Sequence, residues 1–321
     1  MRIKSLFVIF SLLLGASLLL NACAPAATPS PTQQPTPAPL VLTDGLGRQF
    51  TVASPYRKIV SLAASNTEIL FAIGAGDQVI ARDAFSDYPE AALAVKDIGG
   101  GWGEIDMETV VSLEPDLVLA AQINAREQIT ALEQFGLNVF YLANPADLEG
   151  MFENLRLVAR LTGHEAEAEQ LVASLQGRVQ AVDEVIASIS YRPTAKLPTV
   201  FYELDGTDPN APWTAGPGTF IDLLLERAGG SNVGAALDGD WAQISVEALI
   251  AQNPEIILLG DSVWGGITPE MVAARAGWDA IAAVQNDRVY PFDDNLLSRP
   301  GPRMVDGLEA LAKLLHPSEF D

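Results

Sequence analysis

Two tryptophans and two glutamates recur in the chain at one fixed spacing. Trp102 is followed by Glu108, and 139 positions further on Trp241 is followed by Glu247. The stretch WGEIDMETVVSLEPDLVLA aligns without a gap on WAQISVEALIAQNPEIILL. A flat indole face suits an apolar ring ligand, and a rim carboxylate suits a cationic partner. Because solenoid repeats run to only about 20 to 50 residues, this longer period predicts two lobes of one plan with a cleft between them.

Side chains that commonly carry catalysis are sparse. The chain has two histidines, His164 and His316, and one cysteine, Cys23. A Ser-His-Asp or Cys-His arrangement is therefore not expected, and the P-loop, zinc-protease and nucleophile-elbow motifs are absent from the sequence. An enzyme that acts on carbohydrate or phosphate through paired carboxylates stays open as an alternative, with Asp293 and Asp294 as candidates. We predict no catalytic residue, no resident cofactor and no metal site.

Charge and composition narrow the class of partner. The 321 residues include 41 acidic and 19 basic side chains, for a net charge of −22, and 49% are hydrophobic. Such a surface repels phosphate backbones, so a nucleic-acid partner is excluded on electrostatic grounds. The length suffices for one or two domains with cores of ordinary size.

The N-terminal segment predicts export. Arg2 and Lys4 precede an apolar run that is short for a membrane span, which is typical of a secretory signal. Leu20-Asn21-Ala22-Cys23 resembles a bacterial lipobox, so residues 1–22 are predicted as a signal peptide and Cys23 as the lipidated residue. Six prolines follow before residue 40, and this composition makes residues 23–40 an extended tether. The protein is expected outside the cytoplasm, anchored to a membrane by lipid.

Strand and helix signals alternate from Leu40 onward. Ser65 and Glu68 have the spacing of a capping box and are expected to open a helix that glycines close. Alternation of this kind predicts parallel sheets covered by helices. The expected strands are 58–63, 78–82, 116–121, 137–142, 197–204, 255–260 and 288–292, and further helices are expected at 107–113, 125–135, 219–228 and 303–315.

A long helix is predicted between the two lobes. Residues 165–189 carry apolar side chains at steps of three and four, after a shorter helix at 146–161. The predicted fold class is therefore α/β, with two Rossmann-like lobes joined by one long backbone helix. The expected domains are an N-terminal lobe at 41–145, inter-lobe helices at 146–192 and a C-terminal lobe at 193–321.

Several motifs together resemble a known family. IVSLAASNTEILFAIGAGDQVIA, SDYP, LEPDLVLA, PWTAGPGTFIDLLLERAGGSNV and SRPGPR are similar to the substrate-binding lipoproteins of ABC importers for cobalamin and iron chelates. The resemblance extends from about residue 57 to 320 and implies the helical-backbone class of periplasmic binding proteins. It also implies a monomer that captures its ligand in the cleft and docks to a dimeric permease with its ATPase.

Within that family the cobalamin-binding members are the most similar. The resemblance implies that a corrinoid, a broad apolar macrocycle fringed with amides, would contact six residues, which are Tyr88, Trp102, Trp213, Trp241, Asn295 and Arg299. Two positions depart from the pattern, because Ala121 stands where a tryptophan is expected and Asn295 where an aspartate is expected. A ferric siderophore or haem remains the alternative ligand, and Tyr88 suits an axial bond to haem iron.

The repeated glutamates have two explanations. Asp106 and Ser245 are expected to cap helices in which Glu108 and Glu247 hold the second position, where the helix dipole alone favours a carboxylate. The resemblance instead implies that these glutamates bind arginines of the two permease subunits. Only the second explanation accounts for their matched placement in both lobes.

Overall fold

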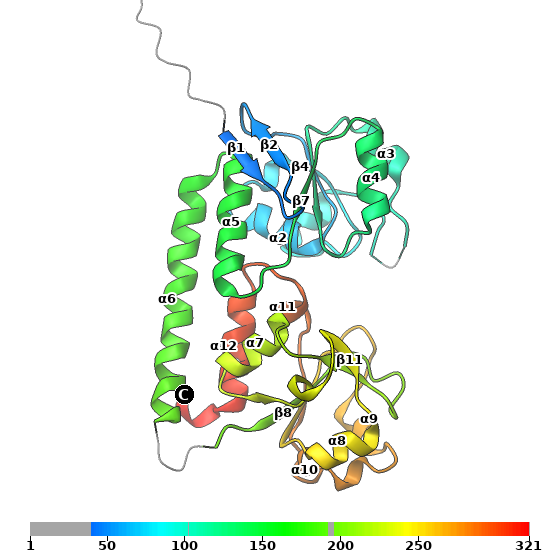
Figure 1. Ribbon diagram of the computed structural model, residues 1–321, viewed down its shortest axis with the longest axis vertical. Helices are drawn as coiled ribbons and strands as arrows, with labels where there is room; N and C mark the ends of the chain where they lie inside the picture. Colours follow the sequence, from blue (N-terminus) through cyan, green and yellow to red (C-terminus); the bar gives the residue numbers. More distant parts are fainter. Residues whose placement is uncertain (1–39, 102, 192–195, 321) are drawn as a thin grey trace, which may run out of the picture. The chain divides into compact units, whose positions relative to one another are not determined.

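The computed structural model describes residues 40–101, 103–191 and 196–320 (Figure 1). Its N-terminal lobe holds a five-stranded parallel sheet in the order β5 (Lys96–Asp97), β4 (Val79–Arg82), β3 (Ile59–Ser61), β6 (Leu117–Ala121) and β7 (Val139–Leu142). All residues of β6 and β7 are buried, as expected for parallel strands with both faces covered. The helices of this lobe are α2 (Ala64–Ala72), α3 (Met107–Ser112) and α4 (Arg126–Gln134), and β1 (Leu40–Thr43) pairs with β2 (Gln49–Val52) in a separate hairpin.

The C-terminal lobe repeats this plan on a smaller sheet. Its four parallel strands run in the order β10 (Ser231–Asn232), β8 (Thr199–Glu203), β12 (Ile256–Leu259) and β13 (Val289–Pro291). β9 (Trp213–Ala215) and β11 (Trp241–Gln243) pair antiparallel in a separate two-stranded sheet, although residues 216–240 lie between them in the chain. This pair of strands is called the β9–β11 ribbon below. The helices are α7 (Phe220–Arg227), α8 (Val246–Gln252), α9 (Pro269–Ala273), α10 (Ala282–Gln285), α11 (Asn295–Ser298) and α12 (Met304–Leu315).

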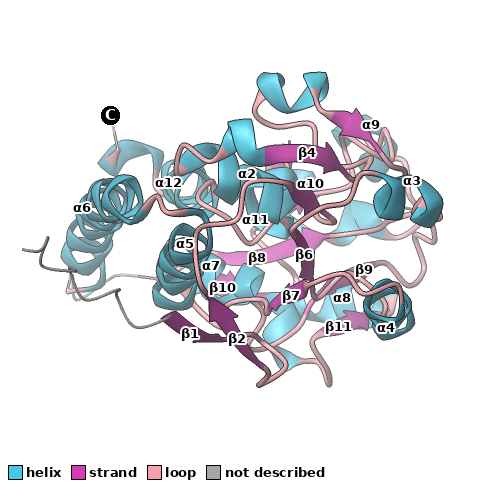
Figure 2. Cartoon of the chain, turned by 90° about the horizontal axis from the view of Figure 1, so that it is seen from above, coloured by secondary structure: helices cyan, strands magenta, loops and turns pink. Residues whose placement is uncertain are grey.

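Two helices join the lobes, α5 (Leu148–Thr162) and α6 (Glu165–Ser190). With 26 residues, α6 is about 39 Å long at 1.5 Å per residue, and it runs alongside both lobes (Figure 1). Its buried residues, Ala168, Val172, Leu175, Val179, Val182 and Ile189, form one stripe. Figure 2 shows α5, α6 and α12 gathered on one side of the sheets.

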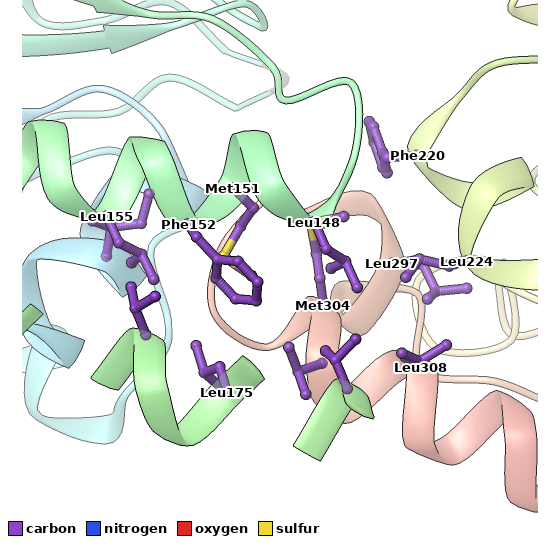
Figure 3. Packing of buried hydrophobic residues seen from close by; sticks show 14 of the residues in the cluster. Leu148, Met151, Phe152, Leu155, Leu175, Phe220, Leu224, Leu297, Met304 and Leu308 are labelled. Carbon is purple, nitrogen blue, oxygen red and sulfur yellow. The ribbon is translucent and has the colours of Figure 1, made fainter. Parts of the chain in front are cut away.

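The hydrophobic core continues from one lobe into the other. Leu148, Met151 and Phe152 of α5 pack in one cluster with side chains of α6, α7 and α12 (Figure 3). The same cluster extends into the first sheet through Ile59 and Leu119, and into the second through Ile256. Close packing of this kind resists rearrangement, so the lobes share a continuous apolar support.

The predicted strands and long helices are confirmed to within a few residues, and the predicted fold class is confirmed. The capping box is wrong: α2 begins at Ala64, its N-cap Ala63 makes no side-chain cap, and Ser65 and Glu68 lie inside the helix. The β9–β11 ribbon was not predicted, because its three-residue strands carry no periodic signal. Across the described ranges 40–101, 103–191 and 196–320, no helix combines the length and apolar character that crossing a membrane requires.

Ligand binding should shift the lobes only slightly. A hinge through α6 would break backbone hydrogen bonds, and movement about α5 would disrupt the shared core. Small-angle scattering with and without ligand should show a change in radius of gyration of less than about 0.5 Å, against a total near 20 Å for a compact unit of this size. A contraction of several times that value would contradict the rigid connection.

Candidate ligand-binding site

The carboxyl ends of the two parallel sheets lie toward each other. In the N-terminal lobe, β3 leads into α2, which carries Glu68, and β4 leads into the loop that carries Asp87. In the C-terminal lobe, β13 leads through α11 to Arg299 and Arg303. Arg299 Nη1 lies 2.5 Å from Asp87 Oδ1, so these two edges meet. Ligands of open α/β sheets bind at carboxyl ends, and the boundary between the lobes is therefore the candidate site.

Glu68 links the lobes through two arginines. Its side chain is only 1% exposed, and it accepts hydrogen bonds from Arg303 Nε at 2.8 Å and Arg303 Nη2 at 2.5 Å. Arg299 Nη1 adds a longer contact of 3.3 Å to Glu68 Oε1. A buried carboxylate needs such partners to offset its loss of water. The residue predicted to cap a helix therefore joins the lobes instead.

Tyr88 lies at the same contact. Its ring is half-exposed, and the guanidinium carbon of Arg303 lies 4.0 Å from the ring centroid, within the range of a cation–π interaction. Two of the predicted ligand residues, Tyr88 from one lobe and Arg299 from the other, are thus brought together. Each side chain has a neighbour across the lobe boundary or beside it, Arg303 for Tyr88 and the two carboxylates of Glu68 and Asp87 for Arg299.

The β9–β11 ribbon of the C-terminal lobe carries Trp213 and Trp241. Trp241 pairs with Ala215, and Gln243 pairs with Trp213. Residues opposite each other in an antiparallel pair share a face, and so do residues two apart on one strand. Trp241 lies opposite Ala215, which is two residues from Trp213, so both indoles lie on one face as diagonal neighbours. They are 41% and 46% exposed, which is unusual for tryptophan in a core. Whether Trp213 and Trp241 contact a ligand stays a prediction.

The β9–β11 ribbon is attached at the carboxyl end of β8. Trp213 N donates to Asp205 O at 2.9 Å, and Leu204 N donates to Trp213 O at 2.9 Å. Phe220, the first residue of α7, supports Trp241 with an edge-on ring contact at 5.9 Å. The two indoles therefore lie at the carboxyl end of the sheet that also leads to Arg299, and Phe220 packs against the Trp241 ring.

Asn295 begins α11 and is half-buried. Its Nδ2 donates to Asp293 Oδ1 at 2.9 Å, which occupies the amide that was predicted to contact the ligand. The neighbouring Asp294 accepts from the hydroxyl of Tyr202 at 2.7 Å. Burial raises the pKa of the Asp294 carboxyl above its usual range. Whether Asn295 contacts a ligand remains a prediction.

Two further acids lie at the end of the second sheet, but both are fully buried. Glu203 accepts from Arg275 Nη1 at 2.5 Å and Nη2 at 2.9 Å, and burial raises the pKa of Glu203 to about 7 although Arg275 acts in the opposite direction. Asp261 accepts from Gly206 N at 2.8 Å, and burial raises its pKa as well. A glycosidase needs two carboxyls that reach substrate, and Glu203 and Asp261 do not reach solvent.

The internal repeat of the sequence is matched by repeated backbone features in the two lobes. Asp106 and Ser245 cap α3 and α8 as predicted, and Glu108 and Glu247 are exposed at the second position of each helix. Glu114 and Asn253, which follow 139 positions apart, both have positive φ, at 46° and 48°. The two glutamates therefore occupy equivalent positions in the structure as well as in the sequence.

Trp264 was not singled out from the sequence. Its side chain is more than half exposed on the loop after β12. Asp261 in that loop accepts a hydrogen bond from Gly206 N, which joins it to the loop after β8. Its position a few residues beyond a predicted strand was the available signal.

Two predicted sites, Trp102 and Cys23, lie outside the described residues. No cluster of three potential metal ligands occurs within the described part of the chain.

Comparisons with known proteins agree with this architecture. The family model described as "Periplasmic binding protein" matches residues 59–296. An ABC transporter substrate-binding lipoprotein of Bacillus subtilis, YvrC, is 31% identical over 97% of this chain and 98% of that protein. A cobalamin-binding protein of Halobacterium salinarum is 28% identical over 96% of this chain and 84% of that protein. The periplasmic haem-binding protein RhuT of Roseiflexus sp. RS-1 superimposes with a TM-score of 0.72 at 26% identity, over 82% of this chain and 99% of that chain.

Two α/β lobes bridged by a long helix, with exposed aromatic rings at facing sheet edges, define a receptor for a solute. The chain belongs to the periplasmic binding protein family, and it is the substrate-binding component of an ABC importer, not an enzyme. The predicted family and the predicted absence of catalysis are confirmed.

Proposed function

We propose that this receptor binds a corrinoid between its lobes and delivers it to the permease of its importer. The observation that carries the proposal is the pair of half-exposed indoles, Trp213 and Trp241, on one face of the β9–β11 ribbon. A broad, mostly apolar macrocycle buries more area against two such faces than a small polar solute does. The cobalamin-binding relative in Halobacterium salinarum supports this choice of ligand.

The charges at the lobe boundary support a ligand fringed with amides. Arg299 and Arg303 are the guanidinium groups that the second lobe presents to the first, and both already contact carboxylates. A ligand rich in carboxylates gains little from cations that are already paired. Haem remains the second candidate because Tyr88 is exposed and could bind iron, and because a haem-binding protein has the same fold.

The direct test is calorimetric titration of the purified protein with three ligands side by side. Cyanocobalamin, haem and a ferric hydroxamate should be compared at one salt concentration, since charge contributions are screened by salt. The proposal predicts that cyanocobalamin binds most tightly. Tighter binding of haem or of the ferric hydroxamate would assign the receptor to that ligand instead.

Removing either indole should weaken ligand binding. Trp213→Ala and Trp241→Ala should each lower the binding free energy by about 1 to 3 kcal/mol, the range for a large aromatic anchor. The matched control is Tyr191→Ala, because Tyr191 is an exposed aromatic residue at the far end of α6. Calorimetry measures all three. If both tryptophan variants bind as the control does, the β9–β11 ribbon is not part of the ligand site.

We also propose that Cys23 is diacylated and that residues 23–40 tether the receptor to a membrane. The lipobox-like sequence Leu20-Asn21-Ala22-Cys23 motivates this, and the Bacillus subtilis relative is named a lipoprotein. A Cys23→Ser variant should be released from the membrane fraction. Retention of that variant in the membrane would point to another anchor.

A further inference from the structure

Four side chains at the lobe boundary form one charge cluster, which consists of Glu68 and Asp87 from the first lobe and Arg299 and Arg303 from the second. Arg303 donates two hydrogen bonds to Glu68, and Arg299 contacts both Glu68 and Asp87. The two positive and two negative charges balance. The cluster lies beside Tyr88, whose ring Arg303 covers.

The two carboxylates of this cluster are not equivalent. Glu68 is 1% exposed and contacts both arginines, so it is a structural partner. Asp87 is 56% exposed, and among the described residues its side chain pairs with Arg299 alone. Burial by itself would raise the pKa of Asp87, but the hydrogen bond and the positive charge of Arg299 outweigh it, and the pKa lies below the usual value. Asp87 is therefore charged at neutral pH.

This geometry has a consequence for any ligand that carries a carboxylate. The Nη1 group of Arg299 donates to Asp87 at 2.5 Å, so a ligand carboxylate must either displace Asp87 or lie beside a like charge. Like charges brought together at an interface suppress the wrong partner. A peripheral amide carries no charge and meets no such repulsion.

We propose that Asp87 is a specificity-determining residue that selects neutral, amide-bearing ligands by keeping Arg299 from ligand carboxylates. The inference rests on the proposed ligand site between the lobes, and it assigns the charge class of that ligand. Asp87 acts through Arg299, as a positioning residue for the guanidinium. Removing its charge should release Arg299 for a carboxylate.

The test uses two corrinoids that share one ring. One keeps its peripheral amides, and the other has them hydrolysed to carboxylates. Calorimetry on the mature protein should show that Asp87→Asn shifts the ratio of the two affinities toward the carboxylate form by on the order of tenfold. Asp87→Glu keeps the charge and should keep the wild-type ratio.

Asp240→Asn is the matched control. It makes the same change in net charge at an exposed aspartate just before β11, where no side-chain contact with an arginine is found among the described residues. Its ratio should stay within about twofold of wild type. An equal shift in Asp240→Asn would reduce the effect to general electrostatics and overturn the inference.

Haem, with two propionates, separates this inference from the proposed function. If the wild-type protein binds neither corrinoid, the corrinoid proposal fails, but a gain in haem affinity in Asp87→Asn still supports the role of Asp87. If Asp87→Asn gains affinity for neither the hydrolysed corrinoid nor haem, the inference is overturned, whatever the wild-type protein binds.

Discussion

Glu68→Leu should lower the free energy of unfolding by about 3 to 5 kcal/mol, the range for breaking a buried ion pair. The substitution leaves Arg303 without its two hydrogen bonds and Arg299 with Asp87 alone. Both guanidinium groups are largely buried, so water replaces the lost carboxylate poorly. Chemical denaturation followed by circular dichroism measures the change.

Two comparisons make the Glu68 result specific. Glu309 pairs with Arg178 where both side chains are more than a third exposed, so Glu309→Gln should cost less than about 1 kcal/mol. The double variant Glu68→Leu with Arg303→Leu should recover part of the loss, because it leaves one buried guanidinium fewer. If Glu68→Leu costs no more than Glu309→Gln, the inter-lobe contact does not stabilise the fold.

The sequence predicted the elements that carry strong periodicity. The stripe of apolar residues in α6 and the buried run of β6 each follow one period, and burial against a core is what produces such a period. The order of the strands does not follow from such patterns. In the first sheet the order β5-β4-β3-β6-β7 depends on packing between distant segments.

Glu68 shows why contacts at the site are harder to predict than elements. Its spacing from Ser65 matches a capping box, which is a local rule. The partner that decides its role is Arg303, which lies 235 positions away and is brought close only when the lobes assemble. The repeat of Trp102 at position 241 indicates a functional role for Trp241 in the sequence. Trp264 has no such repeat, so the sequence carries no comparable signal for it.

Replacing both Glu108 and Glu247 by lysine should abolish uptake and leave ligand affinity unchanged. Both carboxylates are exposed at the start of short helices, one in each lobe, so reversing their charges does not disturb a core. We propose that each binds a cationic group on one half of the permease, as family resemblance implies. Reversal then places like charges against each other at both contacts.

The chain supplies a matched control for this pair. Glu127 and Glu270 are also exposed and also hold the second position of a helix, in α4 and α9, one in each lobe. Their double lysine variant changes the net charge and the helix dipole interaction in the same way. It should transport normally if docking depends on the two repeated positions.

Uptake by cells that carry the cognate permease, measured beside ligand titration, separates the two explanations of the repeated glutamates. Single changes of Glu108 or Glu247 to glutamine should cause milder, salt-sensitive defects, because rim charges act mainly on the rate of association. The defects should be largest at low salt, where the attraction that the wild type keeps is screened least. Full uptake by the double lysine variant would leave the helix dipole as the sufficient explanation. An equal loss of uptake in the Glu127 and Glu270 double lysine variant would also contradict the docking role. It would show that reversing the charge at the start of any such helix impairs transport.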